Sequence, residues 1–159
     1  MDYTWITDHI AVGGGIWNED NMLELVQLGI THIIDMQIEF DDRPLAESWD
    51  MKVVWIPIDD DFQPKPPEIF EHGTEFAREA LKDPASRLYI HCAAGIHRAP
   101  MMALAVLCSL GWDLERAQEH IAERRFVVDW KEAYVESVRN FLRTSTADDS
   151  QPMSKGPLS

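Results

Sequence analysis

Basic residues are scarce in this sequence compared with acidic ones. Its 159 residues include 14 lysines and arginines against 28 aspartates and glutamates, which gives a formal net charge of −14. A negative charge of this size opposes binding to nucleic acid and to anionic membrane surfaces. We therefore expect no nucleic-acid partner.

Cysteines are also few, because the chain has only Cys92 and Cys108. Two cysteines do not make a disulfide scaffold. The pattern places both on one continuous element, where the intervening helix would separate them by about 24 Å, far beyond disulfide reach. We expect Cys108 to pack in the core and not to protect an oxidised Cys92.

Long apolar runs and targeting signals are missing as well. No stretch is apolar enough to span a bilayer, and residues 1–5 lack the charged and apolar regions of a signal peptide. No prenylation cysteine stands near the end of the sequence at residues 156–159. We expect a cytoplasmic protein without a membrane anchor.

The length and the 45% hydrophobic content fit one domain with a substantial core. We assign residues 1–143 to this domain. Residues 144–159 are rich in Ser, Thr, Asp, Gly and Pro, which predicts a disordered tail.

Apolar spacing predicts an alternation of strands and helices, and therefore a layered α/β domain. Asn18 is a candidate helix cap, and the stretch containing Glu39, Asp41, Asp42 and Glu47 reads as an acidic loop. Strands are predicted over 6–12 (or a hairpin there), 30–36, 52–58 and 88–91. Helices are predicted over about 19–28, 68–81, 98–110, 114–124 and 131–143.

The most informative stretch runs from residue 88 to residue 100. It reads as a short buried strand, a tight loop that opens with Cys92, and a helix start in which Pro100 fits the first turn. A helix N-terminus favours anions, so this position favours the thiolate of Cys92 and prepares a phosphate site. Arg98, six residues after Cys92, offers the planar fork that binds phosphate oxygens in pairs.

The block His91-Cys92-x-x-Gly95-x-x-Arg98 resembles the signature loop of the cysteine-dependent protein tyrosine phosphatases. The chain looks like a small dual-specificity phosphatase over residues 4–142, and its Arg98-Ala99-Pro100 ending resembles the phosphatase-of-regenerating-liver subgroup. This resemblance implies a central, mostly parallel sheet of four to five strands flanked by helices. It also implies a phosphomonoester hydrolase without a cofactor that acts on phosphorylated proteins or peptides.

The residues of the loop have distinct expected roles. Cys92 is the expected nucleophile, which would form a phosphocysteine, and Arg98 would hold the phosphate oxygens. The backbone of the loop would bind the remaining charge, and Gly95 would let the chain turn inward. The predicted phosphate-binding residues are Ala93, Ala94, Gly95, Ile96, His97 and Arg98.

The two loop histidines have open roles. His91 either orients the loop or is a structural residue at the end of the strand, and His97 either adds a phosphate donor or faces solvent. No second cysteine–histidine pair completes a four-ligand set, so we expect no metal site.

A general acid must come from outside the loop. Residues 59–61 are three consecutive aspartates after Pro57 and Ile58. In the regenerating-liver type, a Pro, an apolar residue and two aspartates occur together, and the second aspartate is the acid. That pattern selects Asp60, with Asp59 and Asp61 as alternatives.

Ala99 departs from the family pattern, because most of these phosphatases carry Ser or Thr directly after the arginine. The family hydroxyl is thought to hydrogen-bond the leaving sulfur, so its absence predicts slow hydrolysis of the phosphocysteine.

Two other functions stay open. One is a phosphatase-like binding module with incidental turnover, and the other is a phosphatase of a phosphoinositide, an inositol phosphate or an RNA 5′ end.

The acidic loop carries one further prediction about substrate choice. Its side chains Glu39, Asp41 and Asp42 would favour phosphopeptides with basic flanking residues.

Overall fold

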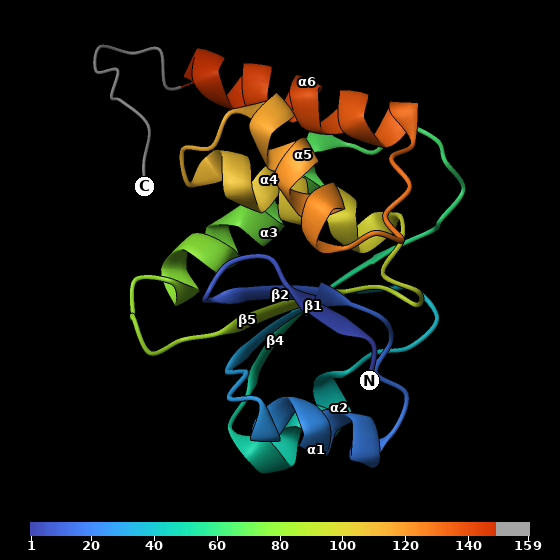
Figure 1. The fold of residues 1–159 in the computed structure, drawn as a ribbon, viewed down its shortest axis with the longest axis vertical. Coiled ribbons are helices and arrows are strands. Elements are labelled where there is room, and N and C mark those ends of the chain that lie inside the picture. The colour runs from blue at the N-terminus through green and yellow to red at the C-terminus, as the bar shows by residue number, and fades with distance from the viewer. Residues whose placement is uncertain (149–159) are drawn as a thin grey trace.

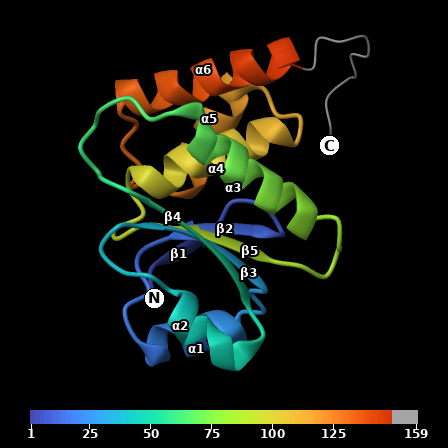
Figure 2. The same cartoon turned by 180° about the vertical axis from the view of Figure 1, so that it is seen from behind.

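A five-stranded sheet divides the protein into two helical layers (Figures 1 and 2). The computed structural model describes residues 1–148. The strands are β1 (Tyr3–Trp5), β2 (Ile10–Gly13), β3 (His32–Gln37), β4 (Lys52–Ile58) and β5 (Leu88–His91). The helices are α1 (Glu19–Gln27), α2 (Arg43–Ala46), the 3₁₀ turn η1 (Glu47–Trp49), α3 (Pro67–Ala80), α4 (Arg98–Ser109), α5 (Leu114–Arg124) and α6 (Glu132–Asp148).

The sheet is mostly parallel, with the strand order β1-β2-β5-β3-β4. Only the edge pair β1–β2 is antiparallel, and β5 lies in the middle between β2 and β3. The fold class predicted from the sequence is therefore confirmed. In such sheets, ligands bind beyond the carboxyl ends of the strands, which is where β5 delivers Cys92.

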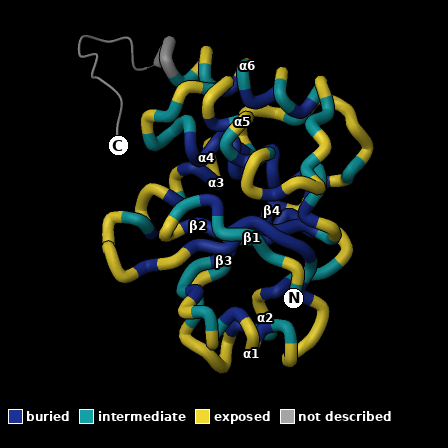
Figure 3. Tube along the Cα trace, in the orientation of Figure 1, coloured by how far each residue is buried: buried dark blue, intermediate teal, exposed yellow. Residues whose placement is uncertain are grey.

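Alternating residues of each strand supply two separate apolar cores. Val12, Ile34 and Ile90 face the helices α3 to α6, whereas Ala11 and Ile33 face α1 and α2. This period of two is the pattern of a sheet that is covered on both faces. Figure 3 shows the buried strands between the two helical layers.

Helix α4 is the central element of the larger layer. Ten of its residues, from Arg98 to Leu107, are buried. A helix that is apolar all round is stable only inside a protein, and α4 contacts α3, α5, α6 and β5. The thiol of Cys108 is partly buried beside this core, as expected, and burial raises its pKa to about 12.

Most predicted elements are present. Asn18 caps α1 through its side chain, and of the strand or hairpin predicted over 6–12 the structure has the hairpin β1–β2, which begins earlier, at Tyr3. Two predictions differ from the structure. The predicted acidic loop contains α2 and η1, because tertiary contacts order this short segment. Helix α6 continues to Asp148, so the predicted boundary at residue 143 falls inside it, and residues 149–159 of the predicted tail lie outside the described residues.

None of the helices described for residues 1–148 has the length and hydropathy needed to cross a membrane.

Candidate active site

Cys92 lies between the central strand and the central helix. Strand β5 ends at His91, a loop covers residues 92–97, and α4 begins at Arg98. The side chain of Cys92 is 2% exposed, and its Sγ atom accepts a hydrogen bond from the backbone N–H of Ala99 at 3.3 Å. The sulfur therefore sits at the positive end of the α4 dipole, where a thiolate is favoured.

The backbone of the loop is oriented to bind an anion. The carbonyls of residues 93–97 all accept hydrogen bonds from donors outside residues 92–97. In a planar trans peptide, the C=O group and the N–H group of the following residue point in opposite directions. The N–H groups of residues 94–98 therefore point away from these partners and are free of them, as in an anion-binding loop, and the next N–H, that of Ala99, contacts the sulfur. The five acceptors and their donors are Ala93 with Gly15 N (3.0 Å), Ala94 with Arg125 Nη2 (3.2 Å), Gly95 with Arg125 Nε (2.8 Å), Ile96 with Asp129 N (3.1 Å) and His97 with Met101 N (3.2 Å).

Gly95 meets a requirement of this loop that no other residue type meets as well. Its φ angle is +68°, a left-handed conformation that favours glycine. A Cβ atom here would lie 2.5 Å from Nη2 of Arg125 and 2.6 Å from the carbonyl of Gly13. The prediction that Gly95 lets the chain turn inward agrees with this geometry.

Arg98 is held in a fixed orientation beneath the loop. Its Nη1 and Nη2 atoms each donate to a different oxygen of Glu39, both at 3.0 Å, and Nη1 also donates to the carbonyl of Ile58 at 3.0 Å. These bonds lower the pKa of the Glu39 carboxyl. The buried Nε of Arg98 has no hydrogen-bond partner within residues 1–148, so this donor is available to an anion.

Among the three consecutive aspartates, Asp60 contacts the loop. Its Oδ2 lies 2.9 Å from Nδ1 of His97, and its Oδ1 accepts a hydrogen bond from the Tyr134 hydroxyl at 2.9 Å. Burial raises the pKa of Tyr134, so its hydroxyl remains a donor. Asp59 is exposed, and Asp61 pairs with Lys65 at 2.6 Å, which lowers the pKa of Asp61.

The loop histidines have different environments. His91 is fully buried, with Nε2 2.5 Å from Oδ2 of Asp42. His97 is partly exposed and lies between Asp60 and Asp129, at 2.9 and 3.5 Å. Its ring therefore contacts carboxylates on both sides, which was not among the roles predicted for it.

The prediction that the acidic segment favours basic peptides stays a prediction, and the structure shows that its three acidic side chains have other contacts. Glu39 pairs with Arg98, Asp41 pairs with Arg43 at 3.0 Å, and Asp42 is fully buried. These three carboxyls therefore have intramolecular partners or are closed to solvent, whereas Glu47 of the same segment is exposed.

One described group has the composition of a metal site. Ligand atoms of Asp35, Asp42 and His91 lie within 4.8 Å of one another, and all three side chains are buried. Two ligands of one zinc ion, each bound at about 2.1 Å, lie roughly 3 Å or more apart. The 2.5 Å separation of Nε2 from Oδ2 is instead that of a short hydrogen bond.

Several residues of the site carried no signal in the sequence. Glu39 orients Arg98, Tyr134 holds Asp60, and Arg125 binds two loop carbonyls while it pairs with Asp2 at 2.7 Å. These residues reach the loop from distant parts of the chain, so no local spacing marks them.

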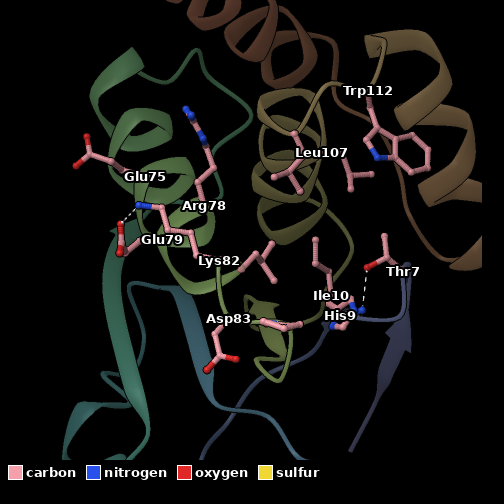
Figure 4. A pocket seen from close by; sticks show the side chains of 13 residues that line it. Thr7, His9, Ile10, Glu75, Arg78, Glu79, Lys82, Asp83, Leu107 and Trp112 are labelled. Atoms are coloured by element: carbon pink, nitrogen blue, oxygen red, sulfur yellow. Dashed lines mark hydrogen bonds and ion pairs between the residues drawn. The ribbon is translucent and has the colours of Figure 1, made fainter. Parts of the chain in front are cut away.

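A cavity of about 700 Å³ lies at the other end of α4 (Figure 4). Leu107 and Leu110 line it near the end of α4, whereas Cys92 precedes the start of that helix. Twelve helical residues span about 18 Å, so the cavity is separate from the cysteine loop. Its charged lining residues are Glu75, Arg78, Glu79, Lys82 and Asp83.

Comparisons with known proteins agree with this geometry. Mouse protein phosphatase Slingshot homolog 3 is 28% identical over 146 residues, which are 89% of this chain and 21% of that protein. Bovine protein tyrosine phosphatase type IVA 3 is 29% identical over 104 residues, 64% of this chain and 59% of the relative. The chain thus spans about a fifth of the mouse relative's length.

A solved structure of PTPMT1 in complex with PI(5)P has the same fold. The TM-score is 0.80 at 19% sequence identity, and the alignment covers 92% of this chain and 98% of that one. Residues 17–144 match the family model described as dual specificity phosphatase, catalytic domain. The resemblance predicted from the loop is confirmed, and the chain belongs to the dual specificity phosphatase catalytic-domain family.

Proposed function

We propose that this protein hydrolyses phosphomonoesters of phosphorylated proteins or peptides through a phosphocysteine on Cys92. The observation that carries this proposal is the buried Nε of Arg98, which has no partner within residues 1–148 and lies in the helix start whose next N–H, that of Ala99, contacts the sulfur. A dianionic phosphoryl group supplies acceptors for all of these donors.

The reaction runs in two displacements. The thiolate of Cys92 attacks phosphorus, the bond to the leaving oxygen breaks, and Asp60 gives that oxygen a proton. Water then attacks phosphorus, the carboxylate of Asp60 takes its proton, and the P–S bond breaks to return the thiolate and release phosphate. Arg98 and the N–H groups bind the equatorial oxygens in both steps.

Ala99 makes the second displacement the slow one. It offers the sulfur a backbone N–H but no side-chain hydroxyl. A missing hydrogen bond to a charged atom is worth about 1.5–3 kcal/mol, or roughly a tenfold to hundredfold lower rate. Rapid-quench assays should show a burst of product equal to the enzyme, and Ala99→Ser should speed the phase that follows. An unchanged slow phase in Ala99→Ser would contradict this role.

Persistence of the intermediate also favours a second function, a binding module with incidental turnover. Cys92→Ser and Asp60→Ala separate the two functions in a pull-down from phosphorylated extracts combined with an activity assay. If the physiological role is recognition, both variants lose hydrolysis and retain the partner.

The test of the proposed function is a substrate panel. Phosphotyrosine, phosphoserine and phosphothreonine peptides and phosphoinositides are assayed with the wild-type protein and with Cys92→Ser. We expect peptide hydrolysis that Cys92→Ser abolishes, because Ala93, Ala94, Ile96 and His97 offer no lysine or arginine for a highly charged headgroup. Preference for phosphoinositides, such as the PI(5)P in the PTPMT1 complex, would overturn the substrate assignment.

A further inference from the structure

Behind the cysteine loop lies a buried group of three titratable side chains. Asp35 comes from β3, Asp42 immediately precedes α2, and His91 ends β5, and all three are 0% exposed. The His91 Nε2 atom lies 2.5 Å from Oδ2 of Asp42 and 3.6 Å from Oδ1 of Asp35. Buried charges without compensation are costly, so the positions of the protons matter here.

The hydrogen-bond partners fix the tautomer of His91. Its Nδ1 atom lies 3.4 Å from the carbonyl oxygen of Cys92, which can only accept, so Nδ1 carries a hydrogen. The contact at Nε2 is therefore made by a proton between the ring and Asp42. The oxygens of Asp35 accept the backbone N–H groups of Gln37 (2.8 Å) and Asp42 (3.0 Å), so Asp35 holds the backbone of this segment beside the pair.

The surroundings place that proton on the carboxyl oxygen. Burial raises the pKa of Asp42 to about 8 and lowers the pKa of His91 to about 4. The other titratable or charged groups around the pair are Asp35 on β3, Asp41 beside Asp42, Tyr89 stacked on the His91 ring at 5.3 Å, the Cys92 thiol, and Arg98 on α4. Burial has the largest effect on the pKa of His91: Asp35 favours an imidazolium and the positively charged Arg98 disfavours it, and the net shift is downward.

We propose that Asp42 is a positioning residue that acts as a neutral carboxylic acid and donates its O–H to Nε2 of His91. His91 in turn holds the carbonyl of Cys92, and so sets the backbone of the nucleophile. The same segment carries Glu39, which orients Arg98, so residues 39–42 fix both ends of the phosphate loop. This inference rests on the proposed function of Cys92.

Asparagine distinguishes a neutral acid from a carboxylate at residue 42. An asparagine amide can donate N–H to Nε2 but cannot ionise, so Asp42→Asn mimics the protonated acid, whereas Asp42→Ala removes the donor. At pH 6.5 we expect Asp42→Asn to keep kcat/KM within about threefold of wild type and Asp42→Ala to lose about tenfold or more. Asp50→Asn, at an exposed aspartate, is the control for the change in charge.

The pH dependence gives a readout that a purely structural role would not change. As the pH rises through about 8, wild-type Asp42 loses its proton and leaves two carboxylates behind the thiolate, whereas Asp42→Asn stays neutral. The ratio of the variant's kcat/KM to that of wild type should therefore rise several-fold between pH 7 and 8.5. An Asp42→Asn variant that is as impaired as Asp42→Ala at pH 6.5 would show that a carboxylate is needed and would overturn the proposal.

A second measurement needs no catalysis and no variant. In nitrogen-15 histidine NMR of the full chain, His91 should be neutral with its hydrogen on Nδ1 from pH 5 to 7. An imidazolium or an Nε2–H tautomer at pH 7 would contradict the proposal. A protein with this tautomer but no phosphatase activity would refute the proposed function alone, so the two failures are distinguishable.

Discussion

Asp60 shows how three neighbouring residues of one type can differ in chemical role. Its carboxyl contacts His97 of the cysteine loop and the hydroxyl of Tyr134, while Asp61 is occupied by Lys65. The contacts of these side chains, and not their sequence positions alone, separate a candidate proton donor from a solvated acid.

Replacing this acid should slow the first displacement. We expect Asp60→Asn to lower kcat/KM, which reports the first displacement, about a hundredfold or more for substrates whose alcohol is a poor leaving group, because a positioned acid contributes about 10²–10⁴-fold. The loss should be much smaller for an aryl phosphate with an acidic phenol, which leaves without a proton. Asp61→Asn is the matched control, and a larger loss in that variant would move the acid to Asp61.

At this scale the sequence predicts residues that belong to one local pattern. Cys92, Gly95 and Arg98 were recognisable because they recur at fixed spacing in one loop. Glu39, Asp42 and Tyr134 were not, because their roles depend on which distant segments the fold brings against the loop. The position of His97 in the loop was predicted, but its contact with Asp60 was not, because spacing says nothing of which distant side chain lies beside it.

Among the elements, the junction between α5 and α6 braces the cysteine loop. Arg125, which is 2% exposed, directly follows α5 and donates to the carbonyls of Gly95 and Ala94 and to the side chains of Asp2 and Thr4. It thereby connects the N-terminal strand, the end of α5 and the phosphate loop through one guanidinium.

Removing this brace should affect stability and phosphate binding together. Arg125→Met keeps the apolar stem but leaves loop carbonyls unpaired, so we expect the free energy of unfolding to fall by about 2–3 kcal/mol. Affinity for phosphate, measured by competitive inhibition, should fall as well. The neighbouring exposed Arg124→Met is the control, and equal effects of the two variants in denaturant titrations would contradict the bracing role.

The long helices and the strand β5 were predictable, whereas the short helices α2 and η1 were not. The regular apolar spacing of α5 and the capped start of α1 agree with the structure, because both signals are local. Helix α2 has four residues, and its preceding Asp42 makes no side-chain cap because that carboxyl faces His91. Its helical form depends on burial of Ala46 and on the fold around it.

For the whole molecule, the buried carboxyls couple folding to pH. Burial raises the pKa of Asp35 to about 7 and that of Asp42 to about 8, above their ordinary 3.8, and lowers that of His91 to about 4. Above pH 6.5 His91 is neutral in the folded protein and mostly neutral in the unfolded chain, while the folded protein alone retains carboxyl protons. Stability therefore falls as pH rises from 6.5 through 8, by up to about 1.4 kcal/mol per pH unit for each retained proton.

Urea titrations at several pH values check this linkage. The wild-type free energy of unfolding should decrease between pH 6.5 and 8, and Asp42→Asn should show a shallower decrease. Asp50→Asn should follow the wild-type curve. A wild-type stability that is level or rises over this interval would show that the group holds no excess proton.

In the proposed mechanism, Cys92 carries the phosphoryl group during turnover. The direct measurement is acid quenching within the first turnover, followed by mass spectrometry of the peptide that contains Cys92. We predict one phosphoryl group on Cys92, less of it at steady state in Ala99→Ser, and none in Cys92→Ser. Phosphate release with Cys92 unmodified at every time point, or undiminished release by Cys92→Ser, would contradict the account.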